Sequence, residues 1–155
     1  MHMRLIFSLL AATLALSAQT PRAQAHGYFG LDNPSGHNFE YNSVGAGADV
    51  FVYKGAAFSP SAGYLFANGN DGGKLAIVTV NGSYHFLRGK GPFEPFVTAG
   101  YGAYANLGGG QSMFNYGGGA NYWFKKHIGV RAEVLNFQTR TYRELTSIRF
   151  GVSFR

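Results

Sequence analysis

The last eleven residues of the chain, 145–155, alternate between apolar and polar side chains. The apolar positions are Ile148, Phe150, Val152 and Phe154, and the polar or small ones are Ser147, Arg149, Gly151 and Ser153. Because successive side chains of a β-strand point to opposite faces, this segment predicts a strand with one apolar face and one polar, charged face. A strand that is apolar outside and polar inside suits a barrel surrounded by lipid.

The same two-residue period recurs upstream and predicts eight strands. Their expected ranges are 26–32, 43–53, 58–67, 74–86, 95–106, 112–124, 128–138 and 145–155. Turn-forming clusters separate them, such as Asn33–Gly36 and Asn68–Gly73. Strands of about ten residues can cross a thin bilayer at a tilt. The pattern therefore predicts an all-β fold, an eight-stranded antiparallel up-and-down transmembrane β-barrel.

The connections between these strands alternate in character. Those after the second, fourth and sixth strands are short and basic, and contain Lys54, Arg88 with Lys90, and Lys125 with Lys126. The others, 33–41, 68–73, 107–111 and 139–144, are longer or richer in Gly, Asn and Thr. Outer-membrane barrels have short periplasmic turns and longer outer loops, so the alternation favours that class and places both chain ends on the periplasmic side.

The N-terminal segment has the features of a secretory signal. A basic start (Met1–Arg4) precedes an apolar run (Leu5–Ala18), and the small-x-small sequence Ala23–Ala25 follows. This order predicts a cleaved signal over residues 1–25 and a barrel domain over 26–155. The alternative is a membrane anchor, but the apolar run is shorter than the roughly 20 residues that a spanning helix needs.

Composition supports an exported barrel and excludes other classes. The chain has 23 Gly, 14 Phe and 10 Tyr, only 13% charged residues and no Cys. Abundant aromatic residues argue against disorder, and the lack of Cys removes a disulfide scaffold. Arg4 and Arg22 belong to the expected signal, so 11 of the 13 basic residues remain against 7 acidic ones. The remaining cations are scattered, so no nucleic-acid partner is expected.

The alternation also assigns residues to the inside of the barrel. We expect a polar network in the lumen, formed by Asp49, Asn121, Arg131, Glu133 and Arg149, because a buried charge needs a partner. Asn81, His85 and Asn115 fall on the same face. Aromatic residues near strand ends predict two interfacial girdles; they are Tyr53, Phe58, Phe66, Phe86, Phe93, Phe96, Phe114, Tyr122, Phe124, Phe137 and Phe154. Gly45, Gly47, Gly100, Gly102, Gly117 and Gly119 fall at inward positions, where they relieve crowding.

Three catalytic or binding motifs were weighed against simpler interpretations. His26, His37 and Glu40 match no closed zinc spacing, so a solvated surface is favoured and no metal is expected. The glycines from Gly100 lie within a strand rather than before a helix, which argues against a dinucleotide cofactor. Ser83 and His85, with Glu133 or Asp49, are candidates for a hydrolase. Inward polar residues more often only fill a lumen, so no catalytic residue and no cofactor are predicted.

Three segments in 93–155 resemble the outer-membrane β-barrel domain family, the small porin-family barrels akin to OmpA and OmpX. They are Pro95–Gly102, Asn115–Trp123 and Ile128–Val134, and the order and spacing of their Gly, aromatic, Arg and Glu residues carry the resemblance. The closing Arg149–Phe154 is similar to the family's terminal signal for the barrel-assembly machinery, so the resemblance implies that Phe150, Val152 and Phe154 form that signal. Arg155, after the final aromatic, is a departure.

These observations together predict a non-enzymatic integral protein of a Gram-negative outer membrane. Its expected partners are membrane lipid, the assembly machinery and an unidentified ligand at the outer loops. Two alternatives stay open at this stage. One is a soluble periplasmic barrel of the lipocalin type that binds an apolar ligand, and the other is a narrow solute pore.

Overall fold

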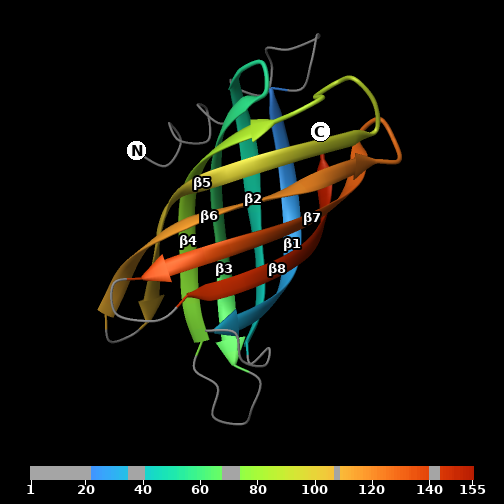
Figure 1. The fold of residues 1–155 in the computed structure, drawn as a ribbon. Coiled ribbons are helices and arrows are strands. Elements are labelled where there is room, and N and C mark those ends of the chain that lie inside the picture. Colours follow the sequence, from blue (N-terminus) through green and yellow to red (C-terminus); the bar gives the residue numbers. More distant parts are fainter. Residues whose placement is uncertain (1–21, 35–40, 68–73, 107–108, 140–143) are drawn as a thin grey trace, which may run out of the picture.

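Eight antiparallel strands close into one barrel in the computed structural model, which describes residues 22–34, 41–67, 74–106, 109–139 and 144–155 (Figure 1). Their bounds are β1 Ala23–Pro34, β2 Tyr41–Tyr53, β3 Ala56–Ala67, β4 Lys74–His85, β5 Phe93–Asn106, β6 Gly109–Trp123, β7 Ile128–Thr139 and β8 Leu145–Phe154. Each strand pairs with its neighbours in sequence. The predicted all-β, up-and-down, eight-stranded architecture is therefore confirmed.

The barrel closes where the first strand meets the last. β1 pairs with β8 from Ala25 opposite Phe154 to Pro34 opposite Leu145, and with β2 from Ala23 opposite Val50 to Asp32 opposite Tyr41. A closed sheet leaves no edge strand with unpaired backbone groups, which is the condition for a β-structure in hydrocarbon.

Several strand ends differ from the expected ranges by a few residues, and two of the differences fall on expected turns or loops. β1 reaches Pro34, although Asn33 and Pro34 were expected in a turn. β6 begins at Gly109, although 107–111 was expected to be a loop. Cross-strand pairing overrides local turn propensity at both places, since Asn33 and Pro34 pair with β8 and Gly109 pairs with Asn106. The expected signal boundary after Ala25 falls inside β1 and stays a prediction.

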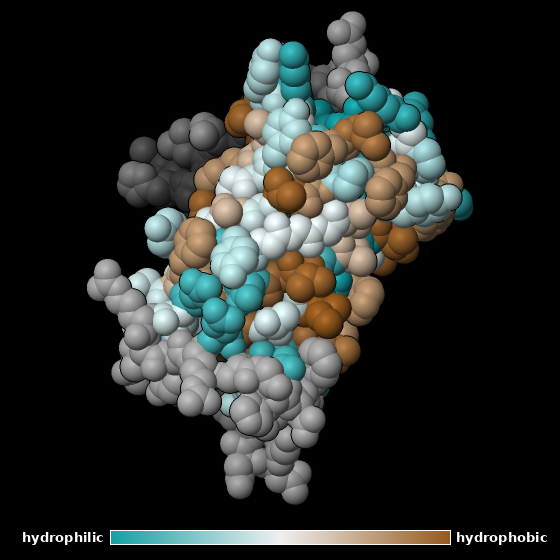
Figure 2. All heavy atoms as spheres, in the orientation of Figure 1, coloured by the Kyte–Doolittle hydropathy of each residue, from teal (hydrophilic) through white to brown (hydrophobic). Residues whose placement is uncertain are grey.

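The two faces of the sheet carry the residues that the alternation predicted. The outward face includes the large apolar side chains Phe29, Val44, Val80, Val97, Val130, Val134, Phe150 and Val152, each between 42% and 55% exposed. In Figure 2, apolar residues cover much of the visible side wall, and hydrophilic residues gather at the end that carries the short turns. Within the described ranges, no helix is long and apolar enough to span a membrane.

Two members of the expected aromatic set face differently from the girdle prediction, and a third departs from strict alternation. Phe96 and Phe137 point inward and are at most 2% exposed, so they belong to the core rather than to a girdle. Strict alternation from Asp49 would turn Tyr53 inward, but it is 68% exposed, as the girdle prediction requires. A register shift between β2 and β3 separates Phe51 from Tyr53, and such a bulge turns the following side chain to the other face.

Candidate functional site

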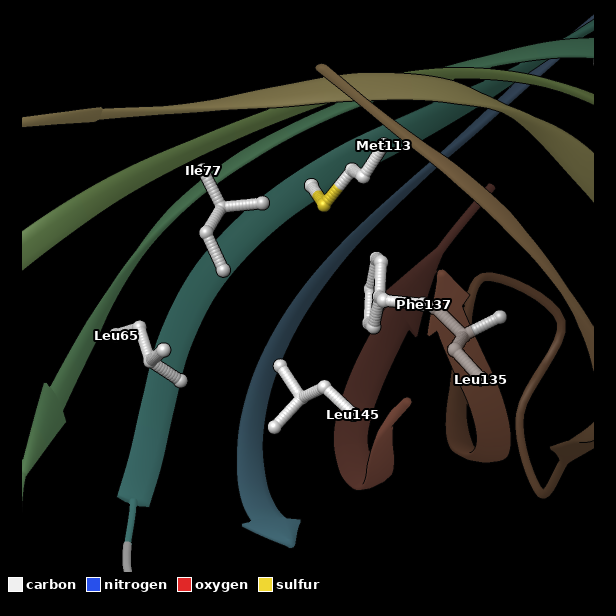
Figure 3. Close-up of a cluster of buried hydrophobic side chains, with 6 residues drawn as sticks. All are labelled: Leu65, Ile77, Met113, Leu135, Phe137 and Leu145. Atoms are coloured by element: carbon white, nitrogen blue, oxygen red, sulfur yellow. The ribbon is translucent and has the colours of Figure 1, made fainter. Parts of the chain in front are cut away.

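The barrel interior holds an apolar cluster at the end that carries the longer connections. Six buried side chains from five strands form it, as Figure 3 shows: Leu65, Ile77, Met113, Leu135, Phe137 and Leu145. Tyr41, Leu75 and Tyr104 pack against it and are partly buried. The sequence analysis predicted a polar lumen only, and this apolar cluster is an addition to it.

A chain of ion pairs fills the middle of the lumen and contains four of the five residues predicted there. The Arg131 guanidinium bonds Asp49 Oδ2 through Nη1 and Glu133 Oε2 through Nε, both at 2.9 Å. Glu133 Oε1 accepts a longer bond of 3.5 Å from Nη1 of Arg149. All four side chains are at most 7% exposed. β2, β7 and β8 thus contribute two acids and two bases to one buried network.

Aromatic rings and hydroxyls complete the surroundings of these charges. The Arg131 guanidinium lies 4.0 Å from the ring centroid of Phe96, and that of Arg149 lies 4.2 Å from the ring of Tyr28. Ser59 donates a hydrogen bond of 2.7 Å to Asp49. Cation–π contacts and charge-assisted hydrogen bonds help to offset the cost of burying charges, which is large for an isolated ion.

A further buried acid, Glu94, lies closer to the end with the short turns. Glu94 Oε1 is 2.8 Å from His85 Nδ1 and accepts a 2.9 Å hydrogen bond from Gln24 Nε2. The other ring nitrogen of His85 lies 3.6 Å from Asp49 Oδ2, so His85 stands between the two groups. Arg155 Nη1 approaches Glu94 Oε2 at 3.7 Å, and its guanidinium covers the Trp123 ring at 4.2 Å.

The fifth predicted network residue, Asn121, is buried and stands opposite Arg131 on the neighbouring strand, but its hydrogen bond is made to another residue. Its Oδ1 accepts a hydrogen bond of 2.9 Å from Ser153. Asn81 and Asn115, which the alternation also placed inside, bond each other reciprocally at 2.8 and 3.0 Å. Inward polar residues therefore form several separate groups along the lumen instead of one network.

Glycine makes room for these side chains, as expected for a narrow barrel. Tyr28 lies against Gly45 of β2 and Gly63 of β3. A Cβ at Gly45 would come within 2.5 Å of the Tyr28 hydroxyl oxygen, and one at Gly63 within 2.6 Å. These distances are too short for any heavy-atom contact, so both positions must lack a side chain while Tyr28 fills the lumen.

Little space remains inside the barrel. A cavity of about 20 Å³ lies among the polar residues, lined by His26, Asp49, Ser61, Arg131 and Arg149 among others. That volume holds about one water molecule. A cavity of this size offers no room for an apolar ligand of the kind that a lipocalin binds.

The metal and hydrolase motifs have the following outcomes. His26 is 6% exposed and points into the lumen, with Nδ1 at 4.0 Å from Asp49, so the prediction of a solvated surface is wrong for this residue. His37 and Glu40 lie outside the described residues.

The hydrolase candidates do not contact each other. Ser83 bonds Ser59 at 2.7 Å, and His85 bonds Glu94 instead of Ser83. The Ser83–His85 pair therefore lacks the nucleophile–base contact that a hydrolase needs.

Two buried polar residues, Glu94 and Gln24, lie just outside the strand ranges that the sequence predicts. Glu94 precedes Pro95, where the fifth strand was expected to begin, but the alternation of Phe96 and Thr98 extends back to it without interruption. Gln24 was assigned to the signal, and it is 2% exposed in β1. Both residues continue the two-residue alternation of inward side chains beyond the expected strand ends.

Phe150, Val152 and Phe154, the expected assembly signal, lie on the outer face of β8 at the seam of the barrel. They stand opposite Phe29, Gly27 and Ala25 of β1.

Comparison with solved structures supports the fold. The chain is similar to the N-terminal β-barrel domain of OprF from Pseudomonas aeruginosa, with 19% identity, a TM-score of 0.65, and coverage of 88% of this chain and 98% of that one. The Neisserial surface protein NspA has 15% identity and a TM-score of 0.65 over 85% and 94% of the two chains. Ail of Yersinia pestis has 10% identity and a TM-score of 0.60 over 85% and 95%. No family model and no curated protein sequence matches.

Proposed function

We propose that this chain is an integral outer-membrane β-barrel without enzymatic activity, whose interior is closed and whose surface acts in the cell envelope. The proposal depends on which side chains point outward from the barrel and which point into it. Large apolar side chains point outward, while Asp49, Glu94, Arg131, Glu133 and Arg149 are enclosed. In water this arrangement would expose an apolar band to solvent, whereas in a bilayer the same band contacts hydrocarbon. The fold shared with OprF, NspA and Ail, all outer-membrane barrels, supports the same location.

The soluble alternative requires the opposite facing. A lipocalin-type barrel encloses an apolar ligand and presents polar residues to water. Here the outward positions carry Val, Phe and Tyr, and the small cavity is lined by charged residues such as Asp49 and Arg131. Apolar residues do occur inside, but Phe137 and Met113 fill that region with their own side chains. The geometry therefore favours the membrane barrel.

A closed lumen is favoured over a solute pore by two successive barriers. The apolar cluster around Phe137 occupies one end, and the ion pairs of Arg131 and Arg149 occupy the middle. An eight-stranded barrel is only wide enough for its own side chains. Ions would have to cross an apolar constriction and then a set of paired charges. We expect no steady conductance when the folded protein is placed in a planar bilayer.

Membrane lipid and the barrel-assembly machinery are the proposed partners. The closing strand β8 presents three outward residues that the assembly machinery could recognise before the barrel closes: Phe150, Val152 and Phe154. They lie on the lipid face and take no part in the lumen network. A ligand at the outer loops is also proposed. The connections concerned, which include residues 35–40, 68–73 and 140–143, lie outside the described ranges.

Membrane extraction and lipid analysis test the location and the absence of enzymatic activity. The protein is expressed with its N-terminal segment, membranes are washed with carbonate, and the pellet is run on a gel before and after boiling. We expect retention in the pellet and a heat-dependent shift, and release of the protein by carbonate would refute the proposal. Mass spectrometry of lipid A with and without the protein tests for acyl-chain chemistry, where an unchanged acylation pattern is expected.

A further inference from the structure

At the end of the barrel that carries the short turns, the exposed charged side chains of the turns are all basic. We define its basic rim as Lys54, Lys90, Lys125 and Lys126, together with Arg88 and Arg155. The four lysines lie in the turns after β2, β4 and β6 and are exposed. Segments 54–55, 86–92 and 124–127 contain no Asp or Glu. Figure 2 shows this end as hydrophilic.

The buried acids of the lumen already face cations other than the rim lysines. Asp49 and Glu133 pair with Arg131 and Arg149, and Glu94 faces His85 and Arg155. The two rim arginines cover the mouth of the barrel: Arg88 lies 3.5 Å from the centroid of Phe51, and Arg155 covers Trp123. Within the described part of the chain, none of the four rim lysines forms an ion pair. Charge compensation for them has to come from outside the molecule.

The position of the rim relative to the aromatic residues indicates which molecule supplies that charge. Six outward aromatic side chains lie on the strand ends and turns beside the rim: Tyr53, Tyr84, Phe86, Phe93, Tyr122 and Phe124, each at least 44% exposed. Aromatic rings of this kind sit at the headgroup level of a bilayer. The Lys54 ammonium lies 5.1 Å from the Tyr53 ring, which places a cation directly beside this band.

We propose that the basic rim binds anionic phospholipid headgroups in the leaflet that the short turns face. This inference rests on the proposed outer-membrane location. Lysines spaced around the mouth, at headgroup level and without internal counter-charges, are complementary to the phosphates of an anionic lipid such as phosphatidylglycerol. Each lysine near an anionic lipid surface contributes attraction equivalent to about a fivefold change in binding. The rim would select the lipids that surround this end of the barrel.

The test compares three variants of the full chain with the parent protein. K54Q/K125Q/K126Q removes three rim charges, and K54R/K125R/K126R keeps them. K74Q/R140Q/R143Q, the opposite-end variant, removes the charge of Lys74 at the start of β4 and two charges from the sequence between β7 and β8. Each protein is folded into detergent micelles that contain equal amounts of phosphatidylglycerol and phosphatidylcholine. The retained lipids are counted by native mass spectrometry, and a heat-dependent gel shift reports folding.

We expect the parent, the arginine variant and the opposite-end variant to retain phosphatidylglycerol over phosphatidylcholine by about fivefold or more. The glutamine variant should retain both lipids equally while still showing the gel shift. Equal retention by the folded parent protein, or a preference unchanged in the glutamine variant, would overturn the inference and leave the membrane location intact. Binding of the parent to purified cell-wall sacculi without any lipid preference would overturn it in favour of an acidic wall polymer. A parent protein that fails to fold with lipid refutes the membrane location itself.

Discussion

Replacement of Arg131 by methionine should destabilise the barrel more than any surface change. Arg131 makes two charge-assisted hydrogen bonds of 2.9 Å, to Asp49 and Glu133, and each such bond contributes roughly 1.5–3 kcal/mol. Methionine fills much of the volume but leaves two buried carboxylates without their main partner. Breaking a buried ion pair from one side costs about 3–5 kcal/mol, so we expect the free energy of unfolding to fall by that amount.

A double-mutant cycle separates the energy of the Asp49–Arg131 ion pair from the energy lost when Arg131 no longer packs on Phe96. Asp49→Asn alone removes one charge and leaves Arg131 bonded to Glu133, so a cost of about 1–3 kcal/mol is expected. In the double variant no carboxylate at position 49 is left unpaired. Its cost should be smaller than the sum of the single costs by roughly 1.5–3 kcal/mol, within the range of coupling found for residues in contact.

Urea unfolding of the protein in phospholipid vesicles measures these energies. Trp123 is the only tryptophan, it is 4% exposed, and its fluorescence reports opening of the barrel. Lys74→Met, an exposed cation at a strand end, serves as the control and should stay within about 0.5 kcal/mol of the parent. If Arg131→Met behaves like this control, or if the two single costs simply add, the lumen network does not stabilise the barrel.

Three further perturbations probe the lipid face, the lumen glycines and the apolar cluster. Val134→Lys, at mid-strand on the outer face, should lower the stability in vesicles by about 2–4 kcal/mol, and Ile128→Lys, beside a turn, by about 0–1 kcal/mol; equal costs would contradict the assigned depth. Gly45→Ala should cost about 1–3 kcal/mol in urea unfolding because of the clash with Tyr28, whereas Gly82→Ala, with no atom within 4 Å of its Cβ, should be nearly neutral. Phe137→Ala should cost about 3–5 kcal/mol by leaving a hole in the apolar cluster, and a near-zero change would show that this end of the lumen is loosely packed.

Intact-mass measurement of the exported protein decides whether Gln24 belongs to it. A mature chain that begins at His26 lacks the Gln24–Glu94 hydrogen bond, and β1 is then three residues shorter than Ala23–Pro34. In that case Gln24→Ala in the precursor leaves the stability of the mature protein unchanged. A mature chain that begins upstream of Ala23 keeps the bond, and the same substitution should cost about 1–3 kcal/mol because Glu94 is buried.

Alternation predicted which face a residue occupies but not which residues meet inside. It placed Arg149, Arg131 and Asp49 inward correctly because facing depends only on position within a strand. The contact between Asp49 and Arg131 joins residues 82 positions apart and depends on the stagger of strands around a closed barrel. A two-residue period contains no information on that stagger. Asn121 shows the limit, since it shares the inward face with Arg131 but bonds Ser153 instead.

The strand prediction fails where a proline or a turn-forming residue is given more weight than the two-residue alternation of side chains. Pro95 was treated as the beginning of a strand, which hid Glu94, and Asn33-Pro34 was treated as a turn although it pairs with β8. Tyr53 faces outward because a register shift interrupts the alternation of β2, and nothing in the residues around Phe51 marks that shift. Tertiary pairing decides such positions, because each strand of a barrel must find partners on both edges along its whole length.

The acidic residues and the lysines of the basic rim lie in different parts of the barrel. Every acidic residue in the described ranges is either enclosed in the lumen, as Asp32, Asp49, Glu94 and Glu133 are, or lies beside the longer connections, as Glu144 does. Asp49 and Glu133 pair with the lumen arginines and Glu94 faces His85 and Arg155, so none of these three buried acids pairs with a rim lysine. Replacing Glu133 by Gln would weaken the lumen without changing the rim, and replacing Lys125 would do the reverse. If the lumen ion pairs and the basic rim act independently, lipid preference should therefore survive a lumen variant such as Glu133→Gln that still folds.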